Sequence, residues 1–342
     1  MPRLLHALYA AAAIAAALPA VATAESVEDF YKGRTVTIVI GTESGGAYDL
    51  YARFFGQYAT KYIPGHPTFI YQYMPGSGGV KIANYMYNAA PKDGSVIGMM
   101  EQGTPLARVL RKDPGMKFDL GKYKWIGTVA QSFYLIGIWH TAPATTIEGA
   151  RQTEVLLAAS GRGSTTYIYP ALINYITGTK LKVILGYKGA PDMDLSYERG
   201  ETNGRGGTLS AWQIRQRAKV DAGQIKFMVQ IAPKRNPIWP DVPMLADYAK
   251  TDEQRAIIDF MQAPSTVGTS LFTPPETPAD RVDALRKAFD LTMKDPAMLA
   301  EVKKRDVYIT GEPGVEIQAA MVKLAATPEA LVDKVRKAVG IK

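Results

Sequence analysis

Three stretches of the sequence place glycines and small hydroxyl residues between an apolar run and a helical pattern. They read IVIGTESGGAYD from residue 38, FIYQYMPGSGGVKIANY from residue 69 and VLLAASGRGSTTYIYPAL from residue 155. The first turn of a helix has free backbone N–H groups, and its dipole favours negative charge. Glycines let the backbone curl around a ligand and approach it closely. Each joint is therefore a candidate anion site that needs no lysine or arginine.

The residue types that most enzymes use are scarce. After residue 24 the only histidines are His66 and His140, far apart in sequence, and the chain has no cysteine. It has no H-E-x-x-H motif, no G-x-S-x-G elbow and no Walker lysine of the G-x-x-x-x-G-K-[ST] pattern after its glycine-rich loops. We therefore expect a binding protein without catalytic residues, cofactor or metal. The enzymatic alternative is a hydrolase or transferase that uses Ser44 or Ser164 as a hydroxyl nucleophile.

Strand and helix patterns alternate along most of the chain, which is typical of an α/β fold with helices covering largely parallel sheets. The expected strands are Val36–Ile40, Thr68–Tyr73, Val96–Met100, Trp125–Val129, Tyr134–Trp139, Val155–Ala159, Leu181–Leu185 and Ile225–Gln230. The expected helices are Leu50–Tyr62, Val80–Asn88, Thr165–Thr177 and Leu209–Lys219, followed by amphipathic helices after Thr273. Ligands of open α/β sheets bind beyond the carboxyl ends of the strands, where the three joints lie.

The first 24 residues have the pattern of a secretory signal peptide. Arg3 precedes a small-residue apolar core that ends in Ala22-Thr23-Ala24, so we expect cleavage after Ala24 and export to a bacterial periplasm. No later run is apolar and long enough to span a bilayer. The net charge of +8 is spread along the chain, so a nucleic-acid partner is not expected.

At these joints the sequence resembles the Bug/TctC family, the periplasmic solute receptors of tripartite tricarboxylate transporters. The family's first loop is similar to Ile40–Asp49, its second glycine-rich marker to Met74–Val80, and its next marker to Ala90–Val96. Later markers are matched by Tyr187-Lys188-Gly189, by Pro240–Met244 and by TPPETP at 273–278. The matches occur in order along nearly all of the chain after residue 24.

The resemblance implies a two-domain, type II-like periplasmic-binding-protein fold that closes on its ligand as a Venus flytrap, with a mixed, mainly parallel sheet in each domain. Residues 25–132 plus 243–342 would form domain 1, and residues 133–242 would form domain 2. It also implies a small organic carboxylate as ligand, a dicarboxylate or an aromatic acid, TctA/TctB-like membrane subunits as partners and a monomeric receptor. Family resemblance leaves a sensory role, in which the closed form docks on a signalling protein, as an alternative to transport.

Carried onto matching positions, the family's ligand site comprises residues of three loops. They are Ser44, Gly45, Gly46, Ala47 and Tyr48, then Ser77, Gly78 and Gly79, then Arg162, Gly163, Ser164 and Thr165, with Tyr187 nearby. Arg162 and Arg205 are the candidates for a bidentate clamp on a second carboxylate, against the alternative of solvated arginines.

Some residues at these loops depart from the family pattern or have a structural alternative. Glu43 places a negative charge beside an expected anion site, where it either points outward or binds a ligand hydroxyl or amine. Tyr48 either contacts ligand or packs between the domains, and Asp49 is expected to serve the helix start. Trp212, Phe133 and Tyr134 are expected in the core, and His66 and His140 on the surface or in packing roles.

Overall fold

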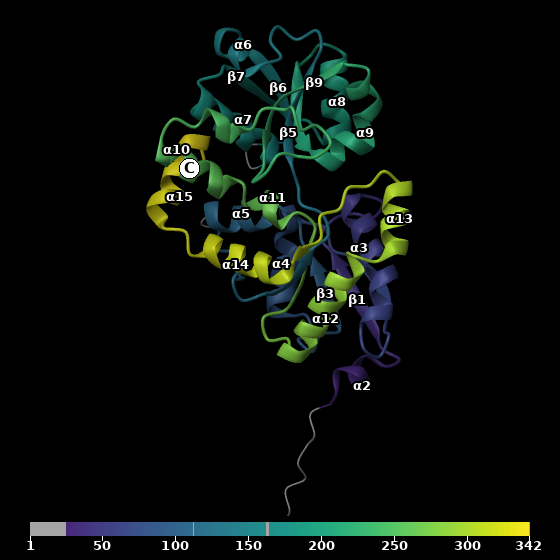
Figure 1. Ribbon diagram of the computed structural model, residues 1–342. Helices are drawn as coiled ribbons and strands as arrows, with labels where there is room; N and C mark the ends of the chain where they lie inside the picture. The colour runs from purple at the N-terminus through teal and green to yellow at the C-terminus, as the bar shows by residue number, and fades with distance from the viewer. Residues whose placement is uncertain (1–24, 112, 162–163, 342) are drawn as a thin grey trace, which may run out of the picture.

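The computed structural model describes residues 25–111, 113–161 and 164–341. The chain forms two lobes, each built on one β-sheet and covered by helices (Figure 1). The lower lobe in that view combines the N-terminal segment with C-terminal helices, and the upper lobe is formed by the middle of the chain.

The first lobe has a six-stranded sheet in the order β11-β4-β10-β3-β1-β2. Its strands are β1 (Thr35–Ile40), β2 (Thr68–Tyr73), β3 (Val96–Met99), β4 (Lys124–Thr128), β10 (Ser270–Thr273) and β11 (Glu312–Pro313). β1 pairs in parallel with β2 and β3, and β10 and β11 pair antiparallel. Because β1 lies between β2 and β3, the loop after β1 emerges at the middle of the parallel part.

The second lobe has a five-stranded sheet in the order β7-β6-β8-β5-β9. Its strands are β5 (Tyr134–Trp139), β6 (Val155–Ala159), β7 (Leu181–Leu185), β8 (Gly204–Thr208) and β9 (Ile225–Ile231). β6 pairs in parallel with β7 and β8, whereas β5 runs antiparallel to β8 and β9. The expected α/β class with two mixed sheets is confirmed, and each sheet has a parallel core.

Helices cover both sheets and also fill the space between the lobes on one side. In the first lobe they are α2 (Val27–Tyr31), α3 (Ala47–Ala59), α4 (Val80–Asn88), α5 (Thr104–Leu110), α12 (Ala279–Thr292), α13 (Pro296–Lys304) and α14 (Gly314–Ala325). In the second they are α6 (Ile147–Gln152), α7 (Thr165–Thr177), α8 (Ala190–Glu198) and α9 (Leu209–Asp221). α10 (Asp252–Met261), α11 (Ala263–Val267) and α15 (Glu329–Val339) lie on one side, between the two lobes (Figure 1).

These last helices join the lobes through an apolar contact and hydrogen bonds. Arg336 of α15 donates to the Leu110 carbonyl of α5 at 2.7 Å, and the Tyr169 hydroxyl of α7 donates to the Met261 carbonyl of α10 at 3.1 Å. Buried apolar residues from both lobes and from α15 belong to one continuous cluster, which includes Val335. The domain boundaries expected at residues 133 and 243 remain predictions; the two sheets lie on either side of the crossing segment 129–133.

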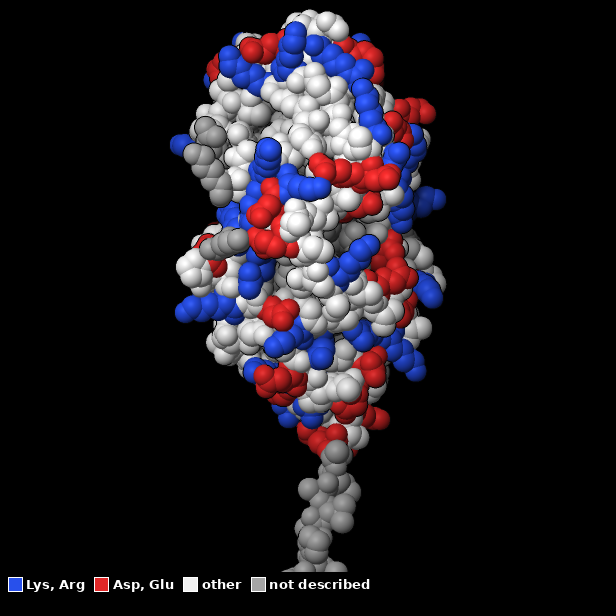
Figure 2. All heavy atoms as spheres, turned by 90° about the vertical axis from the view of Figure 1, so that its left-hand side faces the viewer, with Lys and Arg blue, Asp and Glu red and all other residues white. Residues whose placement is uncertain are grey.

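The surface carries charges of both signs. Figure 2 shows lysine and arginine interspersed with aspartate and glutamate on the face that bears α10 and α15, without a broad basic patch. Within the described ranges, no helix is both long and apolar enough to cross a bilayer. The signal-peptide prediction falls on residues 1–24, outside those ranges.

Candidate functional site

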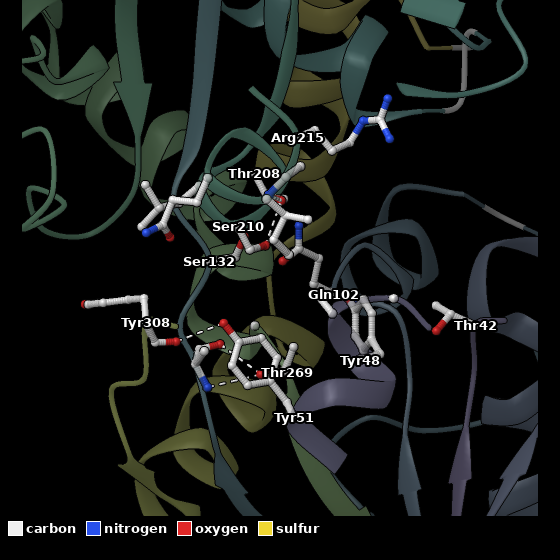
Figure 3. A pocket seen from close by; sticks show the side chains of 18 of the residues that line it. Thr42, Tyr48, Tyr51, Gln102, Ser132, Thr208, Ser210, Arg215, Thr269 and Tyr308 are labelled. Atoms are coloured by element: carbon white, nitrogen blue, oxygen red, sulfur yellow. Dashed lines mark hydrogen bonds between the residues drawn. The ribbon is translucent and has the colours of Figure 1, made fainter. Parts of the chain in front are cut away.

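A cavity of about 540 Å³, here called the first chamber, lies in the cleft between the lobes. The loop between β1 and α3 forms one side of it, and the start of α9 in the second lobe forms the opposite side. Figure 3 shows Ser132, Thr208 and Ser210 gathered on the second-lobe side, across from Tyr48 and Tyr51. The chamber is therefore lined by polar groups from both lobes.

A second cavity of about 480 Å³, here called the second chamber, also lies between the lobes. It is lined by Ser77 and Gly78 before α4, by the residues that lead into α5, and by Ser164 and Thr165 at the start of α7. Tyr48 and Gln102 line both chambers. The Tyr48 hydroxyl accepts a 2.8 Å hydrogen bond from the Gln102 N–H, so these two residues stand where the chambers meet.

Several helix starts with unoccupied N–H groups face this cleft. The N-cap of α3 is Gly46, which has no side-chain cap, and the N–H groups of Gly46, Ala47 and Tyr48 have no acceptor among the described residues. Across the first chamber, Thr208 caps the Ala211 N–H of α9 at 3.3 Å, and the Ser210 N–H has no acceptor in the described chain. Two helix N-termini thus present free donors and positive dipole ends to the same space.

Asp49 fixes the shape of the first loop. Its side chain accepts hydrogen bonds from the Gly45 N–H at 2.9 Å, from Arg53 at 2.7 Å and from Tyr73 at 2.8 Å, and the residue is 7% exposed. Burial alone would raise the pKa of Asp49, but these bonds outweigh it and lower the pKa. Gly45 has a φ of 80°, a conformation that favours glycine. The structural role expected for Asp49 agrees with these contacts.

We expect Asp49→Ala to lower the free energy of unfolding by about 1–3 kcal/mol, because three donors lose a charged, buried acceptor. Ligand affinity should fall as well, since the loop that carries the α3 donors loses its tether. Thermal unfolding and ligand titration measure the two effects. Asp283→Ala, which removes an exposed carboxylate of α12, is the matched control and should change neither. Equal behaviour of the two variants would contradict this role.

Arg215 of α9 reaches the first chamber and is held by a buried carboxylate. Asp194 of α8 is 3% exposed and pairs with Arg205 Nε at 2.6 Å and with Arg215 Nε at 3.0 Å. Burial would raise the pKa of Asp194, but the charge of Arg205 and hydrogen bonds from neighbouring side chains lower it. In Figure 3 the Arg215 guanidinium points away from Ser210 and Ser132, at the edge of the site.

Most of the site residues expected from the sequence line the two chambers. The first chamber contains Glu43, Ser44, Gly45, Gly46, Ala47 and Tyr48, and the second contains Tyr48, Ser77, Gly78, Ser164 and Thr165. Glu43 is exposed at the chamber wall. Arg162 and Gly163 lie outside the described residues. Whether any of these residues contacts a ligand remains a prediction.

Three expected residues lie elsewhere. Arg205 is 1% exposed, with its guanidinium 4.0 Å from the centre of the Trp212 ring and paired with Asp194, so the expectation that it clamps a ligand is wrong. It fails because β8 directs this side chain toward α8 and α9 instead of the cleft. Gly79 lies behind the second chamber, where a Cβ would come within 2.1 Å of Thr104 Oγ1. Tyr187 lines neither chamber.

Sequence reasoning missed the second-lobe side of the first chamber. The missed lining residues on that side include Ser132, Thr208, Leu209, Ser210, Ala211 and Arg215, and Gln102 and Tyr308 of the first lobe were missed as well. The segment GRGGTLSAW from residue 204 carries the same signal as the other joints, because glycines and small hydroxyls again precede a helix. Its strand has no apolar run and was therefore not expected. Trp212, Phe133 and Tyr134 are buried, as predicted, and His66 and His140 are exposed.

The serine-nucleophile alternative finds no geometric support in the described residues. The Ser164 hydroxyl bonds to the Gly161 carbonyl at 2.7 Å and to Thr166 Oγ1 at 2.6 Å, and no histidine, lysine or carboxylate there hydrogen-bonds Ser164 or Ser44. A nucleophilic serine needs such a base. No cluster of three or more potential metal ligands occurs within the described ranges either.

Known proteins resemble this chain along most of its length. No model of a known protein family matches it. A Cupriavidus necator protein, described as the UPF0065 protein in the gbd 5' region, is 26% identical over 328 residues, which cover 92% of each chain. The structure of the periplasmic binding protein BugD superposes with a TM-score of 0.64 at 19% identity, covering 91% of this chain and 99% of BugD.

Two solved structures from Rhodopseudomonas palustris contain a bound acid. MatC with malate superposes with a TM-score of 0.62 at 20% identity, covering 90% of this chain and 99% of MatC. A second protein of that organism, with adipate, gives a TM-score of 0.60 at 21% identity and covers 90% of this chain and 97% of its own. The resemblance seen in the sequence is confirmed: this chain has the two-domain α/β fold of the Bug/TctC periplasmic solute-binding proteins.

Proposed function

We propose that this protein is a Bug/TctC-type solute receptor that captures a small organic carboxylate in the periplasm. The observation that carries the proposal is the first chamber, where free N–H groups of α3 and α9 face each other from the two lobes. A carboxylate placed there accepts donors from both sides, so its binding favours the closed arrangement of the lobes. The acids seen in the solved relatives, malate and adipate, belong to the same chemical class.

The energies of such a site are sufficient for capture. A hydrogen bond to a charged group contributes about 1.5–3 kcal/mol, and each helix start adds about 0.3–2 kcal/mol. Several such contacts offset an association cost of about 4–15 kcal/mol and leave micromolar affinity. The described lining of the first chamber contains one glutamate and one arginine, Glu43 and Arg215, so the backbone supplies most of the anion recognition.

In the proposed pathway, the protein is exported, loses residues 1–24 and works as a monomer. The liganded form delivers the acid to TctA/TctB-like subunits of a tripartite tricarboxylate-type transporter. Receptor capture requires no bond-making step.

The test is a thermal-unfolding screen of the mature protein against mono-, di- and aromatic carboxylates. A ligand at a hundredfold excess over its dissociation constant should raise the free energy of unfolding by about 2.7 kcal/mol. Isothermal titration of the hits then gives affinity and stoichiometry, with one ligand per chain expected. If no carboxylate stabilises the protein while a different chemical class does, the proposed ligand class is wrong.

A further inference from the structure

The second chamber contains a carboxyl group that an anion site would not be expected to have. Glu101, in the segment between β3 and α5, lines this cavity and is partly buried. Its side chain has no hydrogen bond or ion pair in the described chain. Burial accordingly raises the pKa of Glu101. A partly buried carboxyl group without a hydrogen-bond or ion-pair partner lowers the stability of the fold, so its position calls for a functional explanation.

The starts of α4, α5 and α7, none of which has a side-chain cap, border the cavity beside Glu101. Ser77 and Gly78 precede α4, and Gly103 is the N-cap of α5, without a side-chain cap. Ser164, the N-cap of α7, likewise gives no cap and directs its hydroxyl to Gly161. Among the described residues, the other charged or titratable side chains of this lining are Tyr48 and Arg111, the latter at the far end of α5 and engaged in an interaction of its own. Glu101 therefore brings the chain's own negative charge to a cavity beside several helix starts.

This arrangement differs from that of the first chamber. There the helix starts have no acceptor from the chain, and a ligand carboxylate can supply one. In the second chamber Glu101 already supplies the negative charge, so a second ligand carboxylate would meet a like charge across a partly buried space. A hydroxyl, amide or ammonium group would instead give Glu101 the donor it lacks.

We propose that the second chamber receives the far end of the ligand and that Glu101 selects acids whose far end carries a hydrogen-bond donor rather than a second carboxylate. This inference rests on the proposed function and narrows its ligand class. Tyr48 and Gln102 line both chambers, so the proposal places one elongated molecule across these two residues. Acids of this kind are ω-hydroxy acids, ω-amino acids and amide-bearing acids.

The experiment compares four straight-chain series of matched length: monocarboxylates, ω-hydroxy acids, ω-amino acids and α,ω-diacids. Isothermal titration of the mature protein should show a donor-ended acid binding about tenfold or more tighter than the matched monocarboxylate. A hydrogen bond to a charged group is worth about 1.5–3 kcal/mol, and tenfold in affinity corresponds to 1.4 kcal/mol. The matched diacid should bind less tightly than the donor-ended acid.

Glu101→Gln provides the decisive variant because it keeps the size of the side chain and removes its charge. The donor-ended advantage should shrink by about tenfold, and the matched diacid should gain affinity, since the helix starts are left without an anion. Glu201→Gln neutralises an exposed glutamate that lines neither chamber. This variant should bind the four series in the same order of affinity as the native protein. The melting temperature of ligand-free Glu101→Gln should equal or exceed that of the native protein, because a partly buried charge without a partner is removed.

The outcomes separate this inference from the proposed function. If carboxylates bind but diacids are preferred and Glu101→Gln leaves the order unchanged, Glu101 is not a selector and the inference is overturned. If no acid of the four series binds although the wider carboxylate screen yields a ligand, the inference is overturned; if that screen yields none either, the proposed function itself fails. A change of order in Glu101→Gln with an unchanged melting temperature supports selection, because loss of folding cannot produce it.

Discussion

Asp194→Ala is expected to lower the free energy of unfolding by about 3–5 kcal/mol, because it leaves the buried charge of Arg205 without its partner. Asp194 accepts from Arg205 at 2.6 Å, from Tyr197 at 2.9 Å and from Arg215 at 3.0 Å. Arg205 is 1% exposed and is packed on Trp212, so water cannot replace the carboxylate. Arg205 loses its Coulombic partner, and Tyr197 and Arg215 lose their acceptor, in one step.

Chemical denaturation of the native protein and the variant measures this effect. Asp221→Ala breaks an exposed pair with Arg217 one helix turn away, and we expect it to cost less than about 1 kcal/mol. A similar loss in both variants would show that the Asp194 network contributes no more than a surface pair. Because Arg215 loses its tether too, the Asp194 variant is also expected to alter ligand affinity at the edge of the first chamber.

The same network predicts a dependence of stability on pH. The folded-state pKa of Asp194 lies below its ordinary value of 3.8, so the folded protein holds the ionised form more strongly than the unfolded chain does. The stabilisation is fully present above about pH 4 and is lost as the pH falls through the lowered folded value. Asp194→Asn should therefore unfold with a shallower pH dependence than the native protein in acid.

The sequence predicts the fold where apolar periodicity is strong. Tyr134–Trp139, Val155–Ala159 and Leu181–Leu185 are strands with the predicted bounds, and Thr165–Thr177 is a helix with the predicted bounds. These segments are rich in β-branched, aromatic or leucine residues, and their packing agrees with their intrinsic preference. The ordered family markers add the two-domain arrangement, which no single segment reveals.

β8 could not be predicted in this way, because its sequence GRGGT lacks an apolar pattern. Its glycines are required by close contacts with residues that are distant in sequence. A Cβ at Gly204 would lie 2.2 Å from the Gly137 carbonyl, and one at Gly206 would lie 2.1 Å from the Tyr134 hydroxyl. Such close approach is a tertiary property, so the strand and the Arg205 orientation that depends on it are visible only in the folded chain.

The candidate site, like the fold, could be predicted only where the residues that form it are adjacent in sequence. The first loop could be predicted because its glycines and the helix start are adjacent in sequence. The opposing α9 start could not, since only the pairing of β8 with β5 and β6 brings it over the cleft. Glu101 could not be predicted as a lining residue, because the cavity forms between the lobes and no motif near Glu101 in the sequence indicates it.

Ser210→Asp is expected to lower the affinity for the carboxylate ligand by about 100- to 1000-fold while the protein stays folded. Ser210 is the second residue of α9, its N–H has no acceptor in the described chain, and it faces the α3 start across the first chamber. Two like charges about 4 Å apart repel by about 4 kcal/mol at an effective dielectric constant near 20. A tethered carboxylate also occupies the donors that the ligand would use.

Ser210→Asp should weaken ligand binding without lowering the stability of the ligand-free protein. An acidic side chain in the first turn of a helix is favourable by about 0.3–1 kcal/mol, so the melting temperature of ligand-free Ser210→Asp should equal or exceed that of the native protein. Ser210→Asn is the matched control, because it adds similar volume without charge and should retain most of the affinity. If both variants lose affinity equally, the chamber is limited by space at this position.

Undiminished binding in Ser210→Asp would mean that the α9 start does not face the ligand, and the recognition of a carboxylate from both lobes would have to be abandoned. Thermal unfolding of Ser210→Asp shows whether the variant is folded, so that a loss of affinity is not mistaken for a loss of folding. Since the charge on residue 210 and the charge on Glu101 act in different chambers, Glu101→Gln should not restore the affinity that Ser210→Asp removes. The two substitutions therefore locate the two ends of one bound acid.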